Sequence, residues 1–213
     1  MTEPVAQGMV RGFLHRPDAD DVVAGIVLAH GAGSDCNSKP IVAMANAFAE
    51  AGVAALRIDL PFRQARKSGP PYPSTASRDR DGLREACVYL GSFGQVWLGG
   101  HSYGGRQASM LASEEPALCA KLLLLSYPLH SPAKPQQMRT AHFAALAVPS
   151  FFLHGTRDPF GTPAEMESAL RLIAAPHKLQ LIDRAGHDLK PLLTSATSAA
   201  KAFIQWPGTT SEP

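Results

Sequence analysis

The chain has 213 residues, a length typical of one domain, of which 45% are hydrophobic and 18% are charged. Its formal net charge of +2 is too small to indicate nucleic acid or an anionic membrane as the main partner. The odd set of Cys36, Cys87 and Cys119, with no CxxC pair, argues against a disulfide framework and a zinc site. We therefore expect no metal, and a reducing, cytoplasmic environment.

Neither a signal peptide nor a membrane span is expected from the sequence. The first residues contain no basic segment followed by an apolar core. The strongest apolar runs, at 122–125 and 143–153, are short or interrupted by proline, whereas a membrane-spanning helix requires roughly 18 apolar residues. The expected partner is a small molecule and not a membrane.

Short apolar runs alternate with helix-like stretches along most of the chain. After one or two weaker strands near residues 9–14, the predicted elements are, in chain order, strand 25–29, helix 40–51, strand 53–58, an irregular segment at 61–77, helix 78–90, strand 95–98, helix 106–113, strand 122–126, a weak helix within 135–146, strand 150–154, helix 163–174, strand 178–182 and helix 192–204. Strands that are apolar on both faces and are followed by helices predict an α/β fold with a mostly parallel, twisted sheet covered on both sides. We expect about seven strands in a single domain over 1–213, with residues 207–213 as a frayed tail.

Residues 100–104, Gly-His-Ser-Tyr-Gly, match the pattern GxSxG between a predicted strand and a predicted helix. This context is typical of a nucleophile elbow, a strained turn that exposes a serine hydroxyl. A Cβ at Gly100 or Gly104 would clash in such a turn, and the start of the following helix favours negative charge near Ser102. The alternative is a plain glycine-rich turn. We favour Ser102 as a nucleophile.

Four segments, HGAGSD, GGHSYGGR, HGTRDPFG and AGHDL, occur in an order that resembles the α/β-hydrolase superfamily over about residues 25–205. More narrowly, YPLH at 127–130, Arg139-Thr140 and GTRDPFG at 155–161 are similar to a small lidless branch. That branch includes Tex-type and KANL-type proteins and lies near dienelactone-hydrolase-like enzymes. The resemblance implies an α/β-hydrolase fold without a cap domain and a catalytic triad in the chain order serine, acid, histidine.

This chain order leaves few choices for the acid and the base. Some α/β hydrolases carry the acid one strand earlier, but no Asp or Glu occurs between Cys119 and Val148, and Asp183 comes too late. Asp158 follows a predicted strand and is the expected acid, with an ordinary Asp-Pro surface turn as the alternative. His187 follows the last predicted strand and is the expected base, with a structural histidine as the alternative.

Three other histidines lie near the predicted site. His30 and His154 precede glycines at the ends of predicted strands, so we expect them to hydrogen-bond to loop backbone. His101 is adjacent to the nucleophile and is expected to point the other way along the turn.

Acyl transfer places negative charge on a former carbonyl oxygen, which two backbone N–H groups should meet in an oxyanion hole. One donor is expected from Tyr103, the residue after the nucleophile. By resemblance to the HG-x arrangement the other is Ala32, with Gly31 as a near alternative. A phosphate-binding loop is the competing interpretation of this segment, but the required GxxxxGK[ST] does not occur.

Candidate substrate-binding residues are less sharply indicated. Arg63 lies in the Pro- and Gly-rich segment 61–77 and could attract an anionic substrate, although a solvated basic loop is the favoured interpretation. The branch resemblance suggests that Tyr127 and His130 line the pocket. Because the chain before Asp158 has room for one short helix and no cap, we expect an open, shallow site, which argues against long-chain lipid substrates.

The sequence thus predicts a serine hydrolase of the carboxylesterase type that acts on a small ester or thioester through an acyl-enzyme on Ser102, without a cofactor. A peptidase or a lactonase would use the same residues, and the fold does not separate them. A non-catalytic binding or complex subunit with this fold is the alternative from another class.

Overall fold

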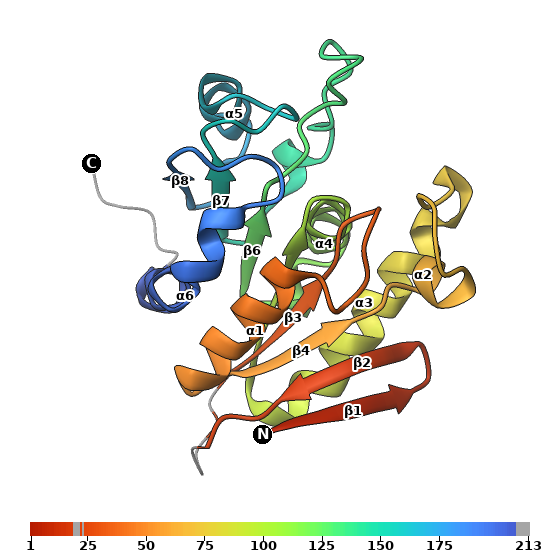
Figure 1. Ribbon diagram of the computed structural model, residues 1–213. Coiled ribbons are helices and arrows are strands. Elements are labelled where there is room, and N and C mark those ends of the chain that lie inside the picture. Colours follow the sequence, from red (N-terminus) through yellow and green to blue (C-terminus); the bar gives the residue numbers. More distant parts are fainter. Residues whose placement is uncertain (19–21, 23, 208–213) are drawn as a thin grey trace.

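Eight strands form one sheet in the computed structural model, which describes residues 1–18, 22 and 24–207 (Figure 1). The strands are β1 (Thr2–Gln7), β2 (Val10–His15), β3 (Ala24–Ala29), β4 (Ala54–Ile58), β5 (Gln95–His101), β6 (Lys121–Leu125), β7 (Ser150–Gly155) and β8 (His177–Ile182). Their order across the sheet is β1-β2-β4-β3-β5-β6-β7-β8. The strands from β3 to β8 run parallel, and β1 and β2 add an antiparallel hairpin beside β4. The predicted mostly parallel sheet is confirmed, with one strand more than the expected seven.

Helices cover both faces of the sheet (Figure 1). The described helices are α1 (Lys39–Glu50), α2 (Pro61–Ala65), α3 (Ala76–Leu90), α4 (Tyr103–Glu114), α5 (Pro163–Leu170) and α6 (Ala196–Gln205). Short 3₁₀ turns lie at Pro73–Thr75, Gly91–Phe93, Pro116–Leu118, Phe143–Ala145 and Lys190–Thr194. Helices α1 and α6 pack on one face, whereas α3, α4 and α5 pack on the other. The fold class predicted from the sequence is confirmed.

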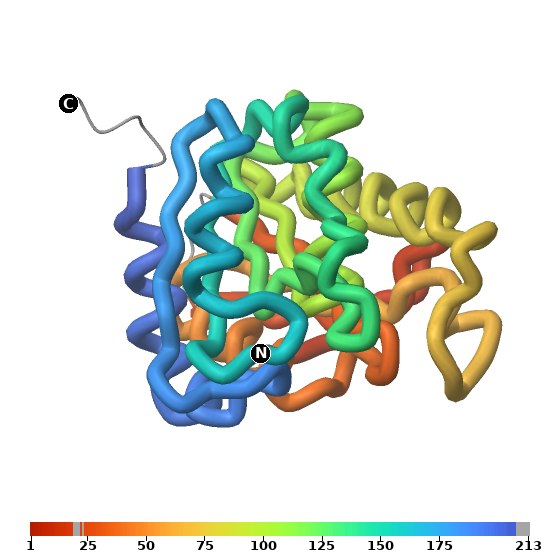
Figure 2. The backbone as a smooth tube through the Cα atoms, turned by 90° about the horizontal axis from the view of Figure 1, so that it is seen from above, coloured from red at the N-terminus to blue at the C-terminus, as the bar shows by residue number. Residues whose placement is uncertain are grey.

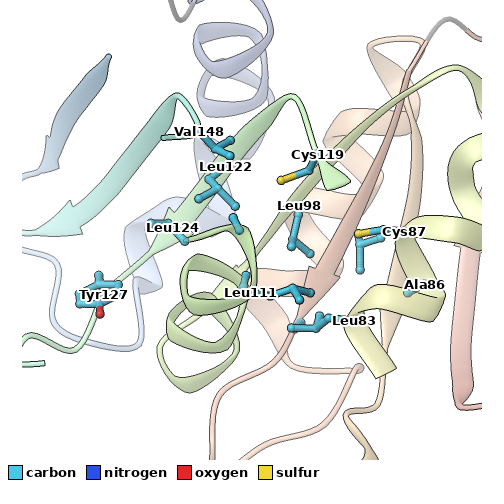
Figure 3. Packing of buried hydrophobic residues seen from close by; sticks show 14 of the residues in the cluster. Leu83, Ala86, Cys87, Leu98, Leu111, Cys119, Leu122, Leu124, Tyr127 and Val148 are labelled. Carbon is cyan, nitrogen blue, oxygen red and sulfur yellow. The ribbon is translucent and has the colours of Figure 1, made fainter. Parts of the chain in front are cut away.

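Two hydrophobic cores lie on the two faces of the sheet, because successive strand residues point to opposite sides. Trp97 of β5 belongs to the core under α1 and α6, and its neighbour Leu98 belongs to the other core. Figure 3 shows Leu98 with Leu111 of α4 and Leu83 of α3 in this second core. Burial on both faces explains why the central strands are continuous apolar runs in the sequence.

The structure corrects several predicted helices. Within 135–146 only the 3₁₀ turn Phe143–Ala145 forms, because the backbone there bonds to the segment that follows β6, with the N–H of Arg139 donating to the carbonyl of Leu129 at 2.7 Å. Helix α5 ends at Leu170 instead of residue 174, where the chain tightens into 3₁₀-type hydrogen bonds. The segment 61–77, expected to be irregular, contains the short helix α2.

Two further predictions concern the C-terminal region. The helix expected at 192–204 divides into the 3₁₀ turn Lys190–Thr194 and helix α6. The predicted frayed tail at 207–213 lies outside the described residues except for Pro207.

The carboxyl ends of the parallel strands meet at one edge of the sheet, at the top of Figure 1, and Figure 2 views the molecule from that side. The connection from β6 to β7 passes this edge with one 3₁₀ turn, so no separate cap covers the edge within the described residues. Among these residues, no helix has the length and apolar character needed to cross a membrane. The carboxyl edge is the place where an α/β sheet presents a ligand site.

Candidate active site

Ser102 lies in a sharp turn between β5 and α4, with φ 52° and ψ −115°. This conformation is costly for a residue with a side chain and holds the hydroxyl at the carboxyl edge of the sheet. A Cβ built at Gly100 would lie 2.6 Å from the carbonyl oxygen of Ala29, and one at Gly104 would lie 2.5 Å from that of His30. Only glycine fits at both positions, as the GxSxG pattern requires.

Ser102, His187 and Asp158 form one hydrogen-bonded chain. The Oγ of Ser102 lies 2.7 Å from Nε2 of His187, and Nδ1 of His187 lies 2.8 Å from Oδ2 of Asp158. Ser102 comes from the turn after β5, Asp158 from the loop after β7 and His187 from the loop after β8. The structure therefore brings together three residues that the sequence analysis grouped, although 85 positions separate the serine from the histidine.

The carboxylate of Asp158 is buried, with 3% of the residue exposed. Burial by itself raises the pKa of Asp158, but the hydrogen bond and positive charge of His187 outweigh it, and the net pKa lies below its usual value. The N–H of Phe160 also donates to Oδ1 at 2.9 Å. Asp158 is therefore held as a carboxylate that can orient an imidazole and stabilise its protonated form.

Two residues that the sequence analysis did not assign to the site hold the imidazole of His187. The ring of Phe160 stacks on it at a centroid distance of 4.1 Å. The Nε2 atom of His101 donates a hydrogen bond of 2.7 Å to the backbone carbonyl of His187 and so holds the backbone from which the imidazole extends. The prediction that His101 points away from the site is wrong, because its ring lies 5.3 Å from the ring of His187 and the residue lines the same cavity as Ser102.

His30 and His154 are fully buried and bond to backbone as predicted. The Nε2 atom of His30 accepts the N–H of Leu60 at 3.1 Å, so its Nδ1 donates to the carbonyl of Gly31 at 2.8 Å. His154 donates from Nε2 to the carbonyl of Gly161 at 2.7 Å. Burial is the main cause that lowers the pKa of both rings, which keeps them neutral.

The loop expected to supply the oxyanion hole lies beside Ser102. A Cβ built at Gly31 would lie 3.5 Å from Cβ of Ser102, and both Gly31 and Ala32 line the cavity. No acceptor within the described residues binds the N–H of Ala32. Tyr103 is the first residue of α4, so its N–H has no acceptor inside the helix. Both N–H groups are thus available to a ligand.

Arg63 does not line the cavity and holds this loop instead. Its guanidinium donates to the carbonyls of Ala32 at 2.9 Å and Ser34 at 2.8 Å, and further to those of Arg66 and Gly69. The residue is 8% exposed. The structure therefore corrects both sequence interpretations of Arg63, because a buried residue with four backbone acceptors is neither a substrate contact nor a solvated charge.

Tyr127 and His130 were also expected to line the pocket, and the structure places neither of them there. Tyr127 is fully buried, and its hydroxyl donates to the carbonyl of Arg139 at 2.7 Å. His130 is 5% exposed, with Nε2 3.4 Å from a carboxylate oxygen of Glu165. The Tyr127 hydrogen bond joins two parts of the connection between β6 and β7, and His130 places this connection against α5.

The cavity that contains Ser102 and His187 has a volume of about 890 Å³. Its walls include residues 31–34, the segment 70–73 and side chains of α4. This volume lies at the upper end of the range for pockets that bind small molecules, which is roughly 300–1,000 Å³. The shallow site expected from the missing cap is therefore replaced by a sizeable cavity. The segments at 70–73 and around Arg139 form walls of this cavity.

The described residues contain no group of three or more His, Cys, Asp or Glu side chains that could hold a metal ion. Cys36, Cys87 and Cys119 are free and buried. Burial is the main cause that raises the pKa of the Cys36 thiol to about 12, so Cys36 behaves as a small buried side chain although it lies near the oxyanion loop.

Fold and site together match the α/β-hydrolase class of proteins. The family model for the alpha/beta hydrolase domain matches residues 22–210, which is most of the chain. The chain belongs to this family, and the resemblance that the sequence motifs indicated is confirmed.

Solved structures with the same fold cover almost the whole chain. Dienelactone hydrolase from Anabaena variabilis has a TM-score of 0.76 at 22% identity, over 96% of this chain and 97% of that one. Est1E from Butyrivibrio proteoclasticus has a TM-score of 0.74 at 16% identity, over 95% of this chain and 97% of that one. XC6422 from Xanthomonas campestris, described as a serine hydrolase without lid, has a TM-score of 0.68 at 15% identity, over 96% and 91%. At these identities the similarity establishes the fold.

Proposed function

We propose that the protein is a serine hydrolase that cleaves a small ester or thioester through an acyl-enzyme on Ser102. The observation that carries this proposal is the hydrogen-bonded chain from Ser102 through His187 to the buried carboxylate of Asp158, with distances of 2.7 and 2.8 Å. A nucleophile, a base and an orienting acid in this arrangement are the parts that acyl transfer needs.

In the first step, Nε2 of His187 takes the proton from Ser102 as Oγ attacks the carbonyl carbon of the substrate. Asp158 accepts the hydrogen bond from Nδ1, which fixes the tautomer and stabilises the imidazolium. The negative charge that develops on the carbonyl oxygen is met by the N–H groups of Ala32 and Tyr103. Removing one such donor typically costs about 3 kcal/mol of transition-state stabilisation.

In the second half of the reaction, His187 gives its proton to the leaving alcohol or thiol, and the acyl group stays on Ser102. A water molecule then attacks the acyl-enzyme while His187 takes its proton, and the acid product leaves as the proton returns to Oγ. Every proton moves through one imidazole, so the reaction needs neither a metal nor a cofactor.

Two other activities use the same residues. A peptidase differs only in the leaving amine, and a lactonase only in a leaving group that stays attached to the acyl chain. The similarity in fold to a dienelactone hydrolase makes lactones part of the substrate panel below. A non-catalytic subunit is disfavoured, since the strained turn, the hydrogen-bonded chain and the free N–H groups all occur together in a cavity of about 890 Å³.

The test is labelling by a fluorophosphonate probe together with hydrolysis of p-nitrophenyl acetate, each repeated with Ser102→Ala. We expect labelling and turnover by the native protein and neither by the variant. No labelling and no turnover by the native protein would refute the hydrolase, and labelling that survives in Ser102→Ala would show that another residue is the nucleophile. A panel of acetyl, butyryl, octanoyl, thioester and lactone substrates then ranks the substrate classes.

We also propose that the protein works in the cytoplasm. The support is that Cys36, Cys87 and Cys119 are all unpaired and buried, as is usual in a reducing compartment. Cell fractionation with an antibody against the protein tests this proposal.

A further inference from the structure

The cavity around Ser102 carries positive charge. Three arginines line it, Arg80, Arg106 and Arg139, and no Asp or Glu of the described residues does. A cavity lined by one sign of charge concentrates ligands of the opposite sign. An arginine acts on such a ligand only if its charge is not already neutralised by a carboxylate of the protein.

Arg80 is already neutralised by the protein. Its Nε donates to a carboxylate oxygen of Glu114 at 3.1 Å, and another guanidinium nitrogen donates to the side-chain oxygen of Gln107 at 3.1 Å. Arg80 therefore adds little net charge to the cavity.

Arg106 and Arg139 lack such partners. Within the described residues no carboxylate lies within 4.0 Å of either guanidinium. Among the described residues, the Nε of Arg106 is buried without a hydrogen-bond acceptor. A buried, unpaired polar group typically costs about 1–3 kcal/mol, and more when it is charged. Folded proteins normally pair such groups, so a guanidinium Nε without an acceptor at the cavity is suited to bind an anionic ligand.

The two guanidiniums come from different elements that the fold holds beside the nucleophile. Arg106 lies one helical turn after Ser102, with its N–H bonded to the serine carbonyl at 2.9 Å. Arg139 is held by its backbone, since its carbonyl accepts the hydroxyl of Tyr127 and its N–H donates to Leu129, both at 2.7 Å. The backbone is thus fixed while the guanidinium is left unbound.

The charges of the pair act on each other. Burial, and after it the positive charge of Arg106, lowers the pKa of Arg139. His142 also lies near the pair. Burial is the main cause that lowers the pKa of His142 to about 4, so its ring is neutral and does not reduce the repulsion between the two arginines. Two like charges that face one cavity repel, and an anion between them would remove the repulsion.

We propose that Arg106 and Arg139 bind an anionic group of the substrate, a carboxylate or a phosphate, while Ser102 attacks an ester elsewhere in the same molecule. This inference rests on the proposed hydrolase function and narrows its substrate class to esters with an anionic group. Guanidinium is suited to this role because its planar donors match the oxygens of carboxylate and phosphate groups.

The test compares esters that differ only in charge. Mono-p-nitrophenyl glutarate is paired with p-nitrophenyl pentanoate, which has the same number of acyl carbons and no carboxylate. The pair p-acetoxybenzoate and methyl p-acetoxybenzoate places the charge on the leaving group instead. We expect the native protein to prefer the charged member of at least one pair by about 10- to 100-fold in kcat/KM, the range that charged hydrogen bonds supply. In the glutarate series, p-nitrophenyl γ-phosphonobutanoate then shows whether phosphonate or carboxylate is favoured.

Two variants assign the preference to the arginine pair. Arg106→Gln and Arg139→Gln are each expected to bring the ratio of kcat/KM between charged and neutral esters close to one. Arg80→Gln removes a positive charge from the same cavity and should leave this ratio within about two-fold, because Glu114 already pairs with it. Fluorophosphonate labelling of each variant reports that Ser102 and its turn are folded.

The outcomes separate this inference from the proposed function. Equal rates for charged and neutral esters in both pairs, with turnover that Ser102→Ala abolishes, would overturn the anion site and leave the hydrolase standing. A preference that persists in both arginine variants would also overturn it. If neither the fluorophosphonate nor any ester reacts, the hydrolase proposal itself fails.

Discussion

His101 and His187, 86 positions apart in the chain, are joined by a hydrogen bond of 2.7 Å from Nε2 of His101 to the backbone carbonyl of His187. Burial is the main cause that lowers the pKa of His101 to about 4, so the ring is neutral at pH 7. A carbonyl only accepts, so Nε2 carries the proton. His101 is therefore a positioning residue that fixes the loop from which the imidazole of His187 reaches Ser102.

Replacing His101 tests this positioning role. We expect His101→Leu to lower kcat for p-nitrophenyl acetate by about 10-fold or more, because small displacements of a catalytic group are costly. His101→Gln, whose amide can still donate, should recover part of the loss. Initial rates over a range of substrate concentrations separate kcat from KM. Equal kcat values for the native protein and His101→Leu would contradict the prediction.

Tyr103 and Asp79 form a partly buried hydrogen-bonded pair beside the turn of Ser102. The hydroxyl of Tyr103 donates to Oδ2 of Asp79 at 2.7 Å, and the N–H of Phe62 donates to Oδ1 at 2.9 Å. Because Asp79 is fully buried, Tyr103→Phe would leave its carboxylate with one partner fewer. We expect a loss of about 1–3 kcal/mol in the free energy of unfolding, measured by urea denaturation.

The control for this pair is the double-mutant cycle with Asp79→Asn. If the hydroxyl stabilises the protein through Asp79, the Tyr103→Phe substitution should cost less in the Asp79→Asn background than in the native one. Equal costs in the two backgrounds would show that the hydroxyl acts through another group.

The turn at Ser102 has no room for a methyl group at Gly104. A Cβ there would lie 2.5 Å from the carbonyl oxygen of His30, which is rigid backbone. We expect Gly104→Ala to destabilise the protein by several kcal/mol, about 1–3 for overpacking plus the backbone shift, and to abolish fluorophosphonate labelling. Gly91→Ala is the matched control, because among the described residues no atom beyond the chain neighbours lies within 4 Å of a Cβ at Gly91, and its φ of −56° suits alanine. Labelling of Gly104→Ala at the native rate would contradict the steric argument.

Arg63 provides a prediction that separates a structural role from substrate binding. Its guanidinium bonds to four carbonyls, including that of Ala32. Arg63→Met should lower kcat by about 10-fold or more and lower the melting temperature, because the oxyanion loop loses its support. KM should change little for neutral and anionic esters alike. A selective rise in KM for anionic esters would instead make Arg63 a substrate contact.

The fold and the three residues of the hydrogen-bonded chain were predictable because their signals are local. The central strands are buried on both faces, so each is a continuous apolar run, and Ser102 and Asp158 closely follow two of them, β5 and β7. His187 follows β8, an edge strand that is only partly buried and has a weaker apolar pattern. In a parallel sheet, the residues that follow the strands meet at one edge. The structure brings the three side chains together, and their catalytic roles remain a proposal.

The residues that the sequence analysis misjudged act through contacts between distant segments. Arg63 lies in a segment rich in Pro and Gly that resembles a solvated loop, and no local pattern shows that its donors meet four carbonyls. Tyr127 follows β6 and was expected at the pocket, yet its hydroxyl bonds to Arg139, 12 positions later. The helix expected within 135–146 was wrong for a related reason, since the backbone of this segment bonds to Leu129 in the segment that follows β6.

The buried histidines predict how stability depends on pH. Burial is the main cause that lowers the pKa of His101 and of His142 to about 4, from 6.5 in an unfolded chain. Between these values the unfolded chain binds more protons than the folded protein, so the free energy of unfolding falls as the pH falls. Above about pH 7 both states are neutral at these rings, and they contribute no slope. Asp79 has the opposite effect on the free energy of unfolding. Burial is the main cause that raises its pKa, so in acid the folded protein takes up a proton at Asp79 more readily than the unfolded chain does.

Urea denaturation at pH values from 8 to 5 measures this dependence. We expect a plateau above about pH 7 and then a decline, to which His101 and His142 each contribute up to about 1.4 kcal/mol per pH unit. His142→Gln should make the decline shallower, because the variant has no ring to protonate on unfolding. His177→Gln is the control, since that side chain is exposed and should leave the profile unchanged. Identical profiles for the native protein and His142→Gln from pH 8 to 5 would show that His142 is protonated equally in the folded and unfolded states.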